Sequence, residues 1–295
     1  MKHIKPFIEF IRQEKRYSAH TIQSYSKDLE QFQVFCHLQY QLEDIDLASY
    51  QHIRSWIVYL MNEKISPKSV NRKISTLRSY YKFCLKRQLI KANPTYGIQG
   101  PKTSKRNPVF VPESQMNKLF DQLQFPDDYE GHRDKMILEL FYCTGMRKAE
   151  LIGLKLGDVD FYQGTIKVLG KRNKERLIPA LPSLLHALQE FINYRAKQDI
   201  SSKTEVLFLS LKGKPLDPKK VYKIVHKYLT GITTVDKKSP HILRHTFATH
   251  MLNNGADING IKEILGHSSL AATQVYTHNS FEKLKGIHKK AHPKG

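Results

Sequence analysis

The sequence contains few of the features expected of a secreted, disulfide-bonded or membrane-spanning protein. Its 295 residues include only three cysteines, Cys36, Cys84 and Cys143, which lie far apart and form no CxxC pair. This spacing argues against a disulfide framework or a cysteine zinc site, so we expect three buried free thiols. No apolar run approaches the roughly 18 residues of a membrane span, and the N-terminal stretch lacks the apolar core of a signal peptide. We therefore expect a cytoplasmic protein.

Acidic residues are scarce relative to basic ones throughout the chain. The net charge is +21, and residues 1–106 carry 19 Lys and Arg against 8 Asp and Glu, leaving +11 there and +10 in the remainder. Because the excess is shared by both parts, it indicates that both face a polyanion such as nucleic acid, with a location at the nucleoid. A generally cationic surface without a specific partner is the alternative.

Glycine is absent from residues 1–93, and proline occurs there only twice, which predicts helices almost throughout. In the stretch 66–88, "SPKSVNRKISTLRSYYKFCLKRQ", Ser66 suits a helix N-cap and Pro67 the first helical position. At helical spacing, one side is apolar, with Val70, Ile74, Leu77, Tyr81 and Cys84. The other side has no acid and carries the predicted phosphate-contacting residues Lys68, Arg72, Arg78, Lys82 and Lys86.

Prolines and glycines then gather in residues 93–112, "NPTYGIQGPKTSKRNPVFVP", which is typical of a linker. This stretch has no acid, and we expect Lys102, Lys105 and Arg106 to contact DNA. The predicted division is a helical domain at 1–95, a basic linker at 96–110, a second domain at 111–280 and a tail at 281–295. Two basic domains joined by a basic linker suggest a C-shaped clamp around a long anionic partner.

The second domain is predicted to mix helices with a little β-structure. Residues 164–180, "GTIKVLGKRNKERLIPA", indicate two short strands around a basic turn that contains Lys171. We expect Arg172 and Lys174 of this turn to contact DNA. The surrounding segments favour helices, one of them ending near Gly145. The predicted fold class is therefore mostly α with a small β-sheet or hairpin, formed by an all-helical N-terminal domain and a mixed α+β second domain.

The segment 241–250, "HILRHTFATH", gathers His241, Arg244, His245 and His250 in an expected helix. His241 and His245, four residues apart, could ligate zinc, but Ile242 stands where an HExxH site has its glutamate, and Arg244 adds a fixed cation. We therefore expect no metal and no cofactor. The same crowding suits a phosphate, because its oxygens accept planar guanidinium donors. No Walker loop, GxGxxG or GxSxG motif is present.

The wider pattern resembles the tyrosine recombinase (phage integrase) family. The resemblance lies in "TGMRKAELIGLKLGDVD", "GKRNKERLIP" and "HILRHTFATHMLNNGADINGIKEILGHSSLAATQVYTH". Their order of Arg, Lys, His-x-x-Arg, His and Tyr matches that family's active-site order. It implies the catalytic set Arg147, Lys171, His241, Arg244, His267 and Tyr276. One departure is Arg172, which stands where close relatives often have glycine.

The resemblance also implies a role for each residue and a metal-free, ATP-free reaction. Tyr276 would be the nucleophile, forming a 3′-phosphotyrosyl link to DNA. Arg147 and Arg244 would bind the phosphate oxygens, and His267 would donate a hydrogen bond to it. We expect Lys171 to be the general acid, and His241 to accept the tyrosine proton. Glu150 is expected to orient Arg147, and His245 and His250 to be structural.

Within the family the chain looks most like the Xer recombinases, because it is short and ends in a similar tail. That likeness implies double-stranded DNA as substrate, a homotetramer or a heterotetramer with a paralogue, a Holliday junction, and a possible DNA translocase activator. It also implies resolution of chromosome dimers at cell division, with the tail packing on a neighbouring subunit. The alternatives are a mobile-element integrase, a type IB topoisomerase-like enzyme, and a DNA-binding protein with a vestigial site.

Overall fold

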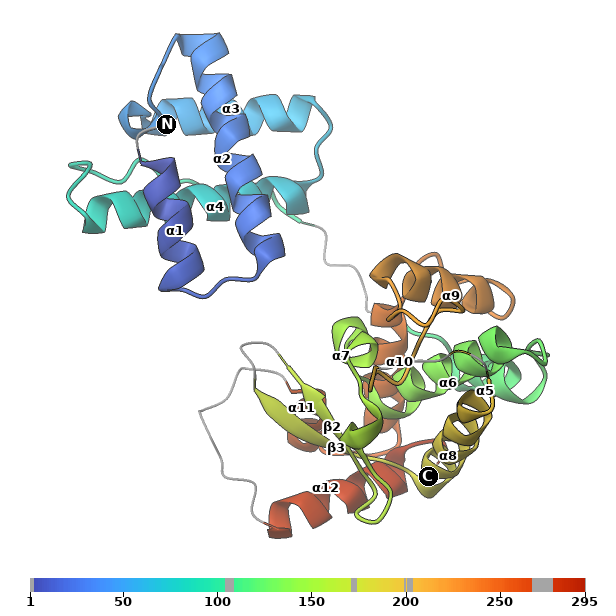
Figure 1. Cartoon of the computed structure of the whole chain (residues 1–295). Helices are drawn as coiled ribbons and strands as arrows, with labels where there is room; N and C mark the ends of the chain where they lie inside the picture. The colour runs from blue at the N-terminus through green and yellow to red at the C-terminus, as the bar shows by residue number, and fades with distance from the viewer. Residues whose placement is uncertain are drawn as a thin grey trace. The chain divides into compact units, whose positions relative to one another are not determined.

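The computed structural model describes residues 3–103, 109–170, 174–198, 200, 204–266 and 278–294, with backbone alone for 278–283. The chain divides into two compact units, Met1–Arg106 and Asn107–Gly295, which are coloured from blue to teal and from green to red in Figure 1. Each unit has a hydrophobic core of its own. Within the described parts, no helix is long and apolar enough to cross a membrane.

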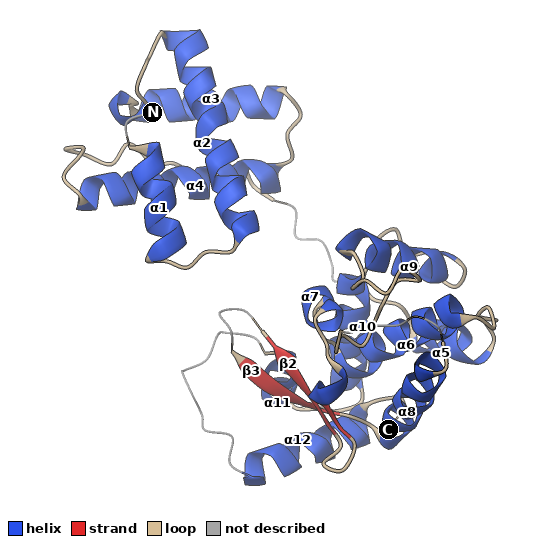
Figure 2. Cartoon of the chain, viewed as in Figure 1, coloured by secondary structure: helices blue, strands red, loops and turns tan. Residues whose placement is uncertain are grey.

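The first unit is built from helices alone among its described residues (Figure 2). They are α1 (Ile4–Gln13), α2 (Ala19–Tyr40), the short 3-10 helix η1 (Ile45–Leu47), α3 (Tyr50–Asn62) and α4 (Pro67–Lys86). The expected N-cap Ser66 accepts a hydrogen bond from the backbone N–H of Ser69 at 3.4 Å, which satisfies one free donor of the first turn of α4. The helices enclose aromatic side chains, including Phe7, Phe32 and Trp56, each at most 1% exposed.

Helix α4 presents its two predicted sides as expected. The apolar residues of the first side are buried, and the five predicted cations of the other side are exposed. The first unit extends past the residue-95 boundary, however, because part of the predicted linker packs on this helix. Ile98 is 3% exposed, Arg78 donates to its carbonyl at 2.5 Å, and Asn71 donates to the carbonyl of Pro101 at 2.9 Å.

The second unit surrounds a small antiparallel sheet with helices. The sheet has the order β1-β2-β3, with β1 (Val159–Asp160), β2 (Thr165–Leu169) and β3 (Glu175–Pro179). The remaining elements are α5 (Glu113–Asp121), α6 (Tyr129–Thr144), α7 (Lys148–Ile152), the 3-10 helix η2 (Leu156–Asp158), α8 (Pro182–Ala196), α9 (Pro218–Thr230), α10 (Pro240–Asn253), α11 (Ile258–Leu265) and α12 (His278–Ala291). The predicted hairpin is β2–β3, and the predicted fold class is confirmed.

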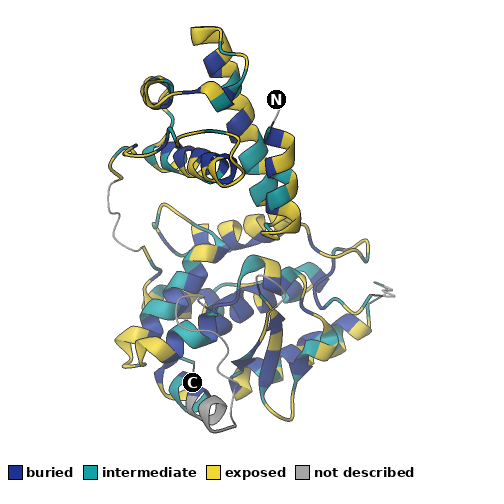
Figure 3. Ribbon diagram, turned by 90° about the vertical axis from the view of Figure 1, so that its left-hand side faces the viewer, coloured by how far each residue is buried: buried dark blue, intermediate teal, exposed yellow. Residues whose placement is uncertain are grey.

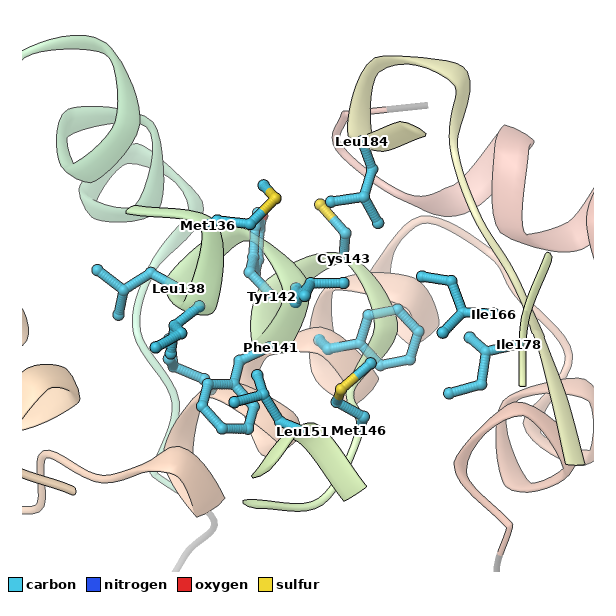
Figure 4. Close-up of a cluster of buried hydrophobic side chains, with 14 of the residues drawn as sticks. Met136, Leu138, Phe141, Tyr142, Cys143, Met146, Leu151, Ile166, Ile178 and Leu184 are labelled. Atoms are coloured by element: carbon cyan, nitrogen blue, oxygen red, sulfur yellow. The ribbon is translucent and has the colours of Figure 1, made fainter. Parts of the chain in front are cut away.

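Helix α6 is buried on nearly every side. Figure 3 shows in dark blue the buried residues, which gather in the interior of each unit. Its C-terminal half, residues 136–144, is apolar apart from Glu139 and Thr144, which suits such a position, whereas the charged residues lie mainly in the first two turns. It packs against α8 and α10, and Figure 4 shows Phe141, Tyr142 and Cys143 in the same buried cluster as Ile166 and Ile178 of the sheet. The three cysteines are free and buried, as predicted.

The C-terminal helix α12 packs on its own chain, against α10, α11 and β3. Leu284, His288, Ala291 and His292 are each at most 4% exposed. Packing of the tail on a neighbouring subunit was the expectation, and it remains a proposal.

Candidate active site

The turn between α6 and α7 brings three elements together. Gly145 ends α6 in the left-handed conformation, with φ of 58°. A Cβ atom there would lie 2.6 Å from Phe247 of α10 and 2.7 Å from Leu265 of α11. Only glycine combines this backbone conformation with such a close approach. The glycine therefore lets α10 and α11 close on the turn that leads into Arg147.

Arg147 precedes the first residue of α7, where Glu150 fixes it twice. Its Nη1 donates to Glu150 Oε1 at 2.8 Å, and its backbone N–H donates to Glu150 Oε2 at 2.8 Å. Its Nη2 donates to the carbonyl of Gly266 at 2.8 Å. The side chain is 26% exposed, so part of the guanidinium stays accessible. These contacts give Glu150 the orienting position that the sequence predicts.

Arg244 reaches the same place from α10 and is 7% exposed. Its Nη1 donates to the carbonyl of Gly145 at 2.6 Å, and its Nη2 donates to that of Leu265 at 2.7 Å. Burial, together with the positive charges of Arg147 and Arg176, lowers the pKa of Arg244 to about 10. The group is still protonated at neutral pH, and a cation held under such repulsion gains from an anion nearby.

A third arginine, Arg176 of β3, joins this cluster and was not singled out from the sequence. Its Nη1 and Nη2 donate to the two oxygens of Glu150 at 2.8 and 2.9 Å, and its Nε donates to the carbonyl of Ile264 at 2.9 Å. Arg176 and Ile178 both lie on the buried side of the strand. The sequence could have indicated this, because Arg176 lies two residues before Ile178 and therefore on the same side of the predicted strand.

The three guanidiniums therefore converge on the C-terminal end of α11, where they donate to the consecutive carbonyls of Ile264, Leu265 and Gly266. Cations are favoured at a helix C-terminus by its partial negative charge. Three arginines and the single Glu150 leave a local charge of two positive units, which favours binding of an anion. We call Arg147, Glu150, Arg176 and Arg244 the arginine cluster.

The other predicted catalytic residues stand in different relations to this cluster. His241 lies on α10, three residues before Arg244, and is exposed. Lys171, His267 and Tyr276 lie outside the described residues. The residues that directly precede Lys171 and His267 are described, however, and both lie at the cluster. They are Gly170 and Gly266. A Cβ atom on Gly170 would lie 3.8 Å from Glu150 Oε1, and the Gly266 carbonyl binds Arg147.

The two remaining histidines of α10, His245 and His250, make none of the contacts described for the arginine cluster. His250 is 3% exposed, and its Nδ1 lies 3.0 Å from the hydroxyl of Tyr142. Burial lowers its pKa, so it packs as a neutral core residue. His245 is half-buried. Among the described residues, no three His, Cys, Asp or Glu side chains gather closely enough to hold a metal ion.

The predicted DNA-contacting residues differ in whether their charged groups bind other groups of the same chain. The exposed α4 residues Lys68, Lys82 and Lys86 project from the helix, whereas Arg72 is paired with the buried Asp28 and Arg78 binds a backbone carbonyl. Lys102 and Lys174 are exposed, and the described residues do not include Lys105, Arg106 or Arg172.

One cationic surface was missed in the sequence. Helix α9 exposes four lysines together with Tyr222 and His226, and its lysines are Lys219, Lys220, Lys223 and Lys227. Its apolar residues Val221, Ile224, Val225, Tyr228 and Leu229 are buried, so the lysines share the outer side. The spacing of "PKKVYKIVHKYL" contained this signal.

Comparisons with known proteins find similarity over both units of the chain. Residues 110–283 match the phage integrase family, and residues 4–88 match the phage integrase N-terminal SAM-like domain. A tyrosine recombinase XerD of Staphylococcus haemolyticus is 37% identical over 294 residues, covering 99% of this chain and 98% of that protein. A tyrosine recombinase XerC of Bacillus subtilis is 36% identical over 295 residues, with 99% and 96% covered.

Solved structures share the fold at lower identity. A XerH site-specific recombinase bound to its palindromic difH substrate aligns with a TM-score of 0.72 and 21% identity, covering 96% of this chain and 83% of that one. The integrase of transposon Tn1549, bound to transposon right end DNA, aligns with a TM-score of 0.73 and 20% identity, covering 95% and 97%. The family match over most of the second unit, and relatives similar over nearly the whole length, show that the chain belongs to the phage integrase family of tyrosine recombinases.

Proposed function

We propose that the protein recombines DNA at specific sites by cleaving and rejoining strands through Tyr276. The observation that carries this proposal is the meeting of Arg147 and Arg244 at adjacent carbonyls, those of Gly266 and Leu265. A guanidinium has five N–H donors, and each of these two uses two of them in the contacts described. Donors therefore remain on both arginines for the two non-bridging oxygens of one phosphate.

The proposed cleavage is a transesterification. The Tyr276 oxygen forms a bond to phosphorus as the bond to the 5′-oxygen breaks, leaving a 3′-phosphotyrosyl link and a free 5′-hydroxyl. Lys171 gives a proton to the departing 5′-oxygen, and His241 takes the phenolic proton. His267 donates a hydrogen bond to the phosphate. Attack by a second 5′-hydroxyl reverses these steps on a new partner strand.

Charge stabilisation in this scheme comes from the arginine cluster. The two guanidiniums stabilise the pentacoordinate transition state, and preorganised donors of this kind are worth roughly 3–4 kcal/mol each when removed. The covalent link conserves the energy of the phosphodiester, so the proposed reaction uses no ATP. Because the guanidiniums stabilise the charge, it also uses no metal ion.

We also propose the biological setting that the sequence suggested. Double-stranded DNA is the substrate, and both units bind it, as a clamp requires. Exchange proceeds through a Holliday junction in a tetramer of this chain alone or with a paralogue, with the tail packing on a neighbour and a DNA translocase as a possible activator. The assembly acts at the nucleoid to resolve chromosome dimers. Relatives called XerC and XerD at near-equal identity support a Xer role.

The second candidate is a mobile-element integrase, favoured by the fold shared with the Tn1549 transposon integrase. Selection of bound sites from fragmented genomic DNA separates the two roles, because dimer resolution predicts one site near the replication terminus. Two copies of the recovered site on a plasmid should then recombine in EDTA without ATP. Loss of activity in EDTA would contradict the metal-free mechanism, and relaxation of supercoils without exchange would favour a topoisomerase.

A further inference from the structure

The C-terminal tail buries two histidines, one within helix α12 and one directly after its last residue. His288 is 1% exposed and His292 is 4% exposed, and both rings lie against Phe247, at 5.8 and 5.7 Å between centroids. The helix is also held by Asn254, whose Nδ2 donates to the Ala291 carbonyl at 3.0 Å. The proposed chemistry uses neither histidine, so their burial needs another reason.

Both histidines donate to the C-terminal end of α6. His288 Nε2 lies 2.7 Å from the carbonyl of Cys143, and His292 Nε2 lies 3.1 Å from that of Tyr142. The last four carbonyls of a helix have no partner within it. Of these four, Phe141 accepts from the Gly145 N–H at 3.0 Å, so the tail supplies donors for the next two. Figure 4 shows Tyr142 and Cys143 at this end of α6, beside Met146.

The same helix end leads directly into the arginine cluster. Gly145, two residues after Cys143, accepts from Arg244 Nη1 at 2.6 Å. The Met146 N–H donates to the Thr144 hydroxyl at 3.2 Å, and the next residue is Arg147. The tail thus holds two carbonyls of this segment and Arg244 holds a third, two residues before Arg147.

The protonation state of the two histidines fits a donor role. Burial lowers the pKa of His288 to about 4, and burial with nearby positive charge lowers that of His292 to about 3. Both rings are therefore neutral at physiological pH. A neutral imidazole has one N–H, and a carbonyl partner requires that N–H to be on Nε2.

We propose that His288 and His292 are positioning residues for Arg147, acting through the Tyr142 and Cys143 carbonyls at the end of α6. A buried carbonyl without a donor is costly, so the α6 end shifts to find one when the tail is absent. Docking of the tail thereby becomes a condition for holding Arg147 beside Arg244. If tails exchange between subunits, the tail that packs against this end of α6 supplies the two N–H donors. The inference rests on the proposed cleavage by Tyr276.

The test compares two substitutions, of which one keeps an N–H donor and the other removes it. His288→Gln keeps an N–H near the Nε2 position, whereas His288→Leu fills similar space without one. Each full-length variant is mixed with a nicked duplex carrying the genomic site recovered by selection. The rate of covalent adduct formation is measured at saturating protein, together with DNA affinity and the melting temperature. The exposed neighbour Lys289→Ala is the control.

We expect His288→Leu to form adduct about 10- to 100-fold more slowly than the wild type at unchanged DNA affinity, with His288→Gln recovering most of the rate. The pair His292→Gln and His292→Leu repeats the test if His288→Leu does not fold. A leucine variant with wild-type rate would overturn the inference, as would equal impairment of leucine and glutamine. Absence of adduct in the wild type would instead refute the proposed function.

Discussion

Glu150 and Arg176 form a buried bidentate ion pair, with Nη1 and Nη2 at 2.8 and 2.9 Å from the two carboxylate oxygens. The same carboxylate binds the side chain and backbone N–H of Arg147. Although burial alone would raise the pKa of Glu150, the hydrogen bonds and charges of Arg176 and Arg147 lower it below its usual value. Arg176 thus acts on Arg147, for which we propose phosphate binding, through one shared carboxylate.

This relationship predicts the effect of changing Arg176. Arg176→Lys keeps the charge but loses the planar fork, so residue 176 gives Glu150 one bond where it gave two. We expect adduct formation on the nicked site to slow about tenfold, with DNA affinity unchanged, and Arg176→Met to slow it further. Wild-type cleavage by Arg176→Lys would show that the bidentate geometry is unimportant.

Removal of the Glu150 charge should chiefly affect stability. Glu150→Gln leaves Arg147, Arg176 and Arg244 together without a counter-charge. Breaking a buried pair in this way costs roughly 3–5 kcal/mol. Denaturant unfolding should show that loss, whereas Glu205→Gln, which alters an exposed pair with Lys155, should leave unfolding nearly unchanged. Equal stability of the two variants would contradict the assignment.

Substituting the two arginines proposed to bind the phosphate should slow cleavage without weakening DNA binding. Arg147→Lys or Arg244→Lys removes donors aimed at one phosphate, so we expect adduct formation to fall by about 10²- to 10³-fold. Affinity for the duplex, which depends on many phosphate contacts, should change little. Lys155→Ala, on an exposed lysine, serves as the charge control. A fall in affinity that matched the fall in rate would place these arginines in general DNA binding.

The buried tail histidines predict an acid-side loss of stability. An unperturbed histidine has a pKa of about 6.5, whereas His288 titrates near 4 in the folded chain because it is buried. Between these values the unfolded chain binds a proton that the folded chain excludes, so the free energy of unfolding falls as pH falls. The slope reaches about 1.4 kcal/mol per pH unit for each histidine.

Unfolding measured from pH 8 to pH 4 checks this prediction. His288→Gln has no titrating group at that position, so its stability should decline less steeply below pH 6.5 than that of the wild type. Superimposable profiles would mean that His288 does not stay neutral when the protein folds.

The exposed lysines of α4 should contribute to affinity through phosphate contacts. Each of Lys68→Gln, Lys82→Gln and Lys86→Gln should reduce the slope of log affinity against log salt by about one. Arg54→Gln, on the exposed side of α3, is the control and should leave the slope unchanged. Arg72 is a poorer probe, because its substitution also leaves Asp28 with one cation fewer.

Several parts of the fold could be predicted because local patterns determine them. The two sides of α4, the turn at Gly145 and the β2–β3 hairpin follow from apolar spacing and from glycine. Arg147 and Glu150 lie three residues apart at a helix start, so their contact was also foreseeable. The pairing of Glu150 with Arg176 was not, since residues 26 apart meet only after the sheet packs on α7.

For the tail, too, the sequence predicts a local element but not the distant surface that it contacts. Apolar Leu284 and Ile287 among lysines indicate a helix with one side to bury, but not the surface that covers it. The carbonyls that make His288 and His292 useful belong to residues about 150 positions earlier, for which local sequence carries no signal.

The central claim is that Tyr276 attacks a phosphate held by Arg147 and Arg244. Its most direct test is adduct formation between full-length protein and a nicked duplex carrying the selected site, followed by peptide mapping of the attachment point. We predict a covalent adduct at Tyr276 in the wild type and none in Tyr276→Phe, at equal DNA affinity. An adduct formed by Tyr276→Phe, or a wild-type attachment at another residue, would contradict the account.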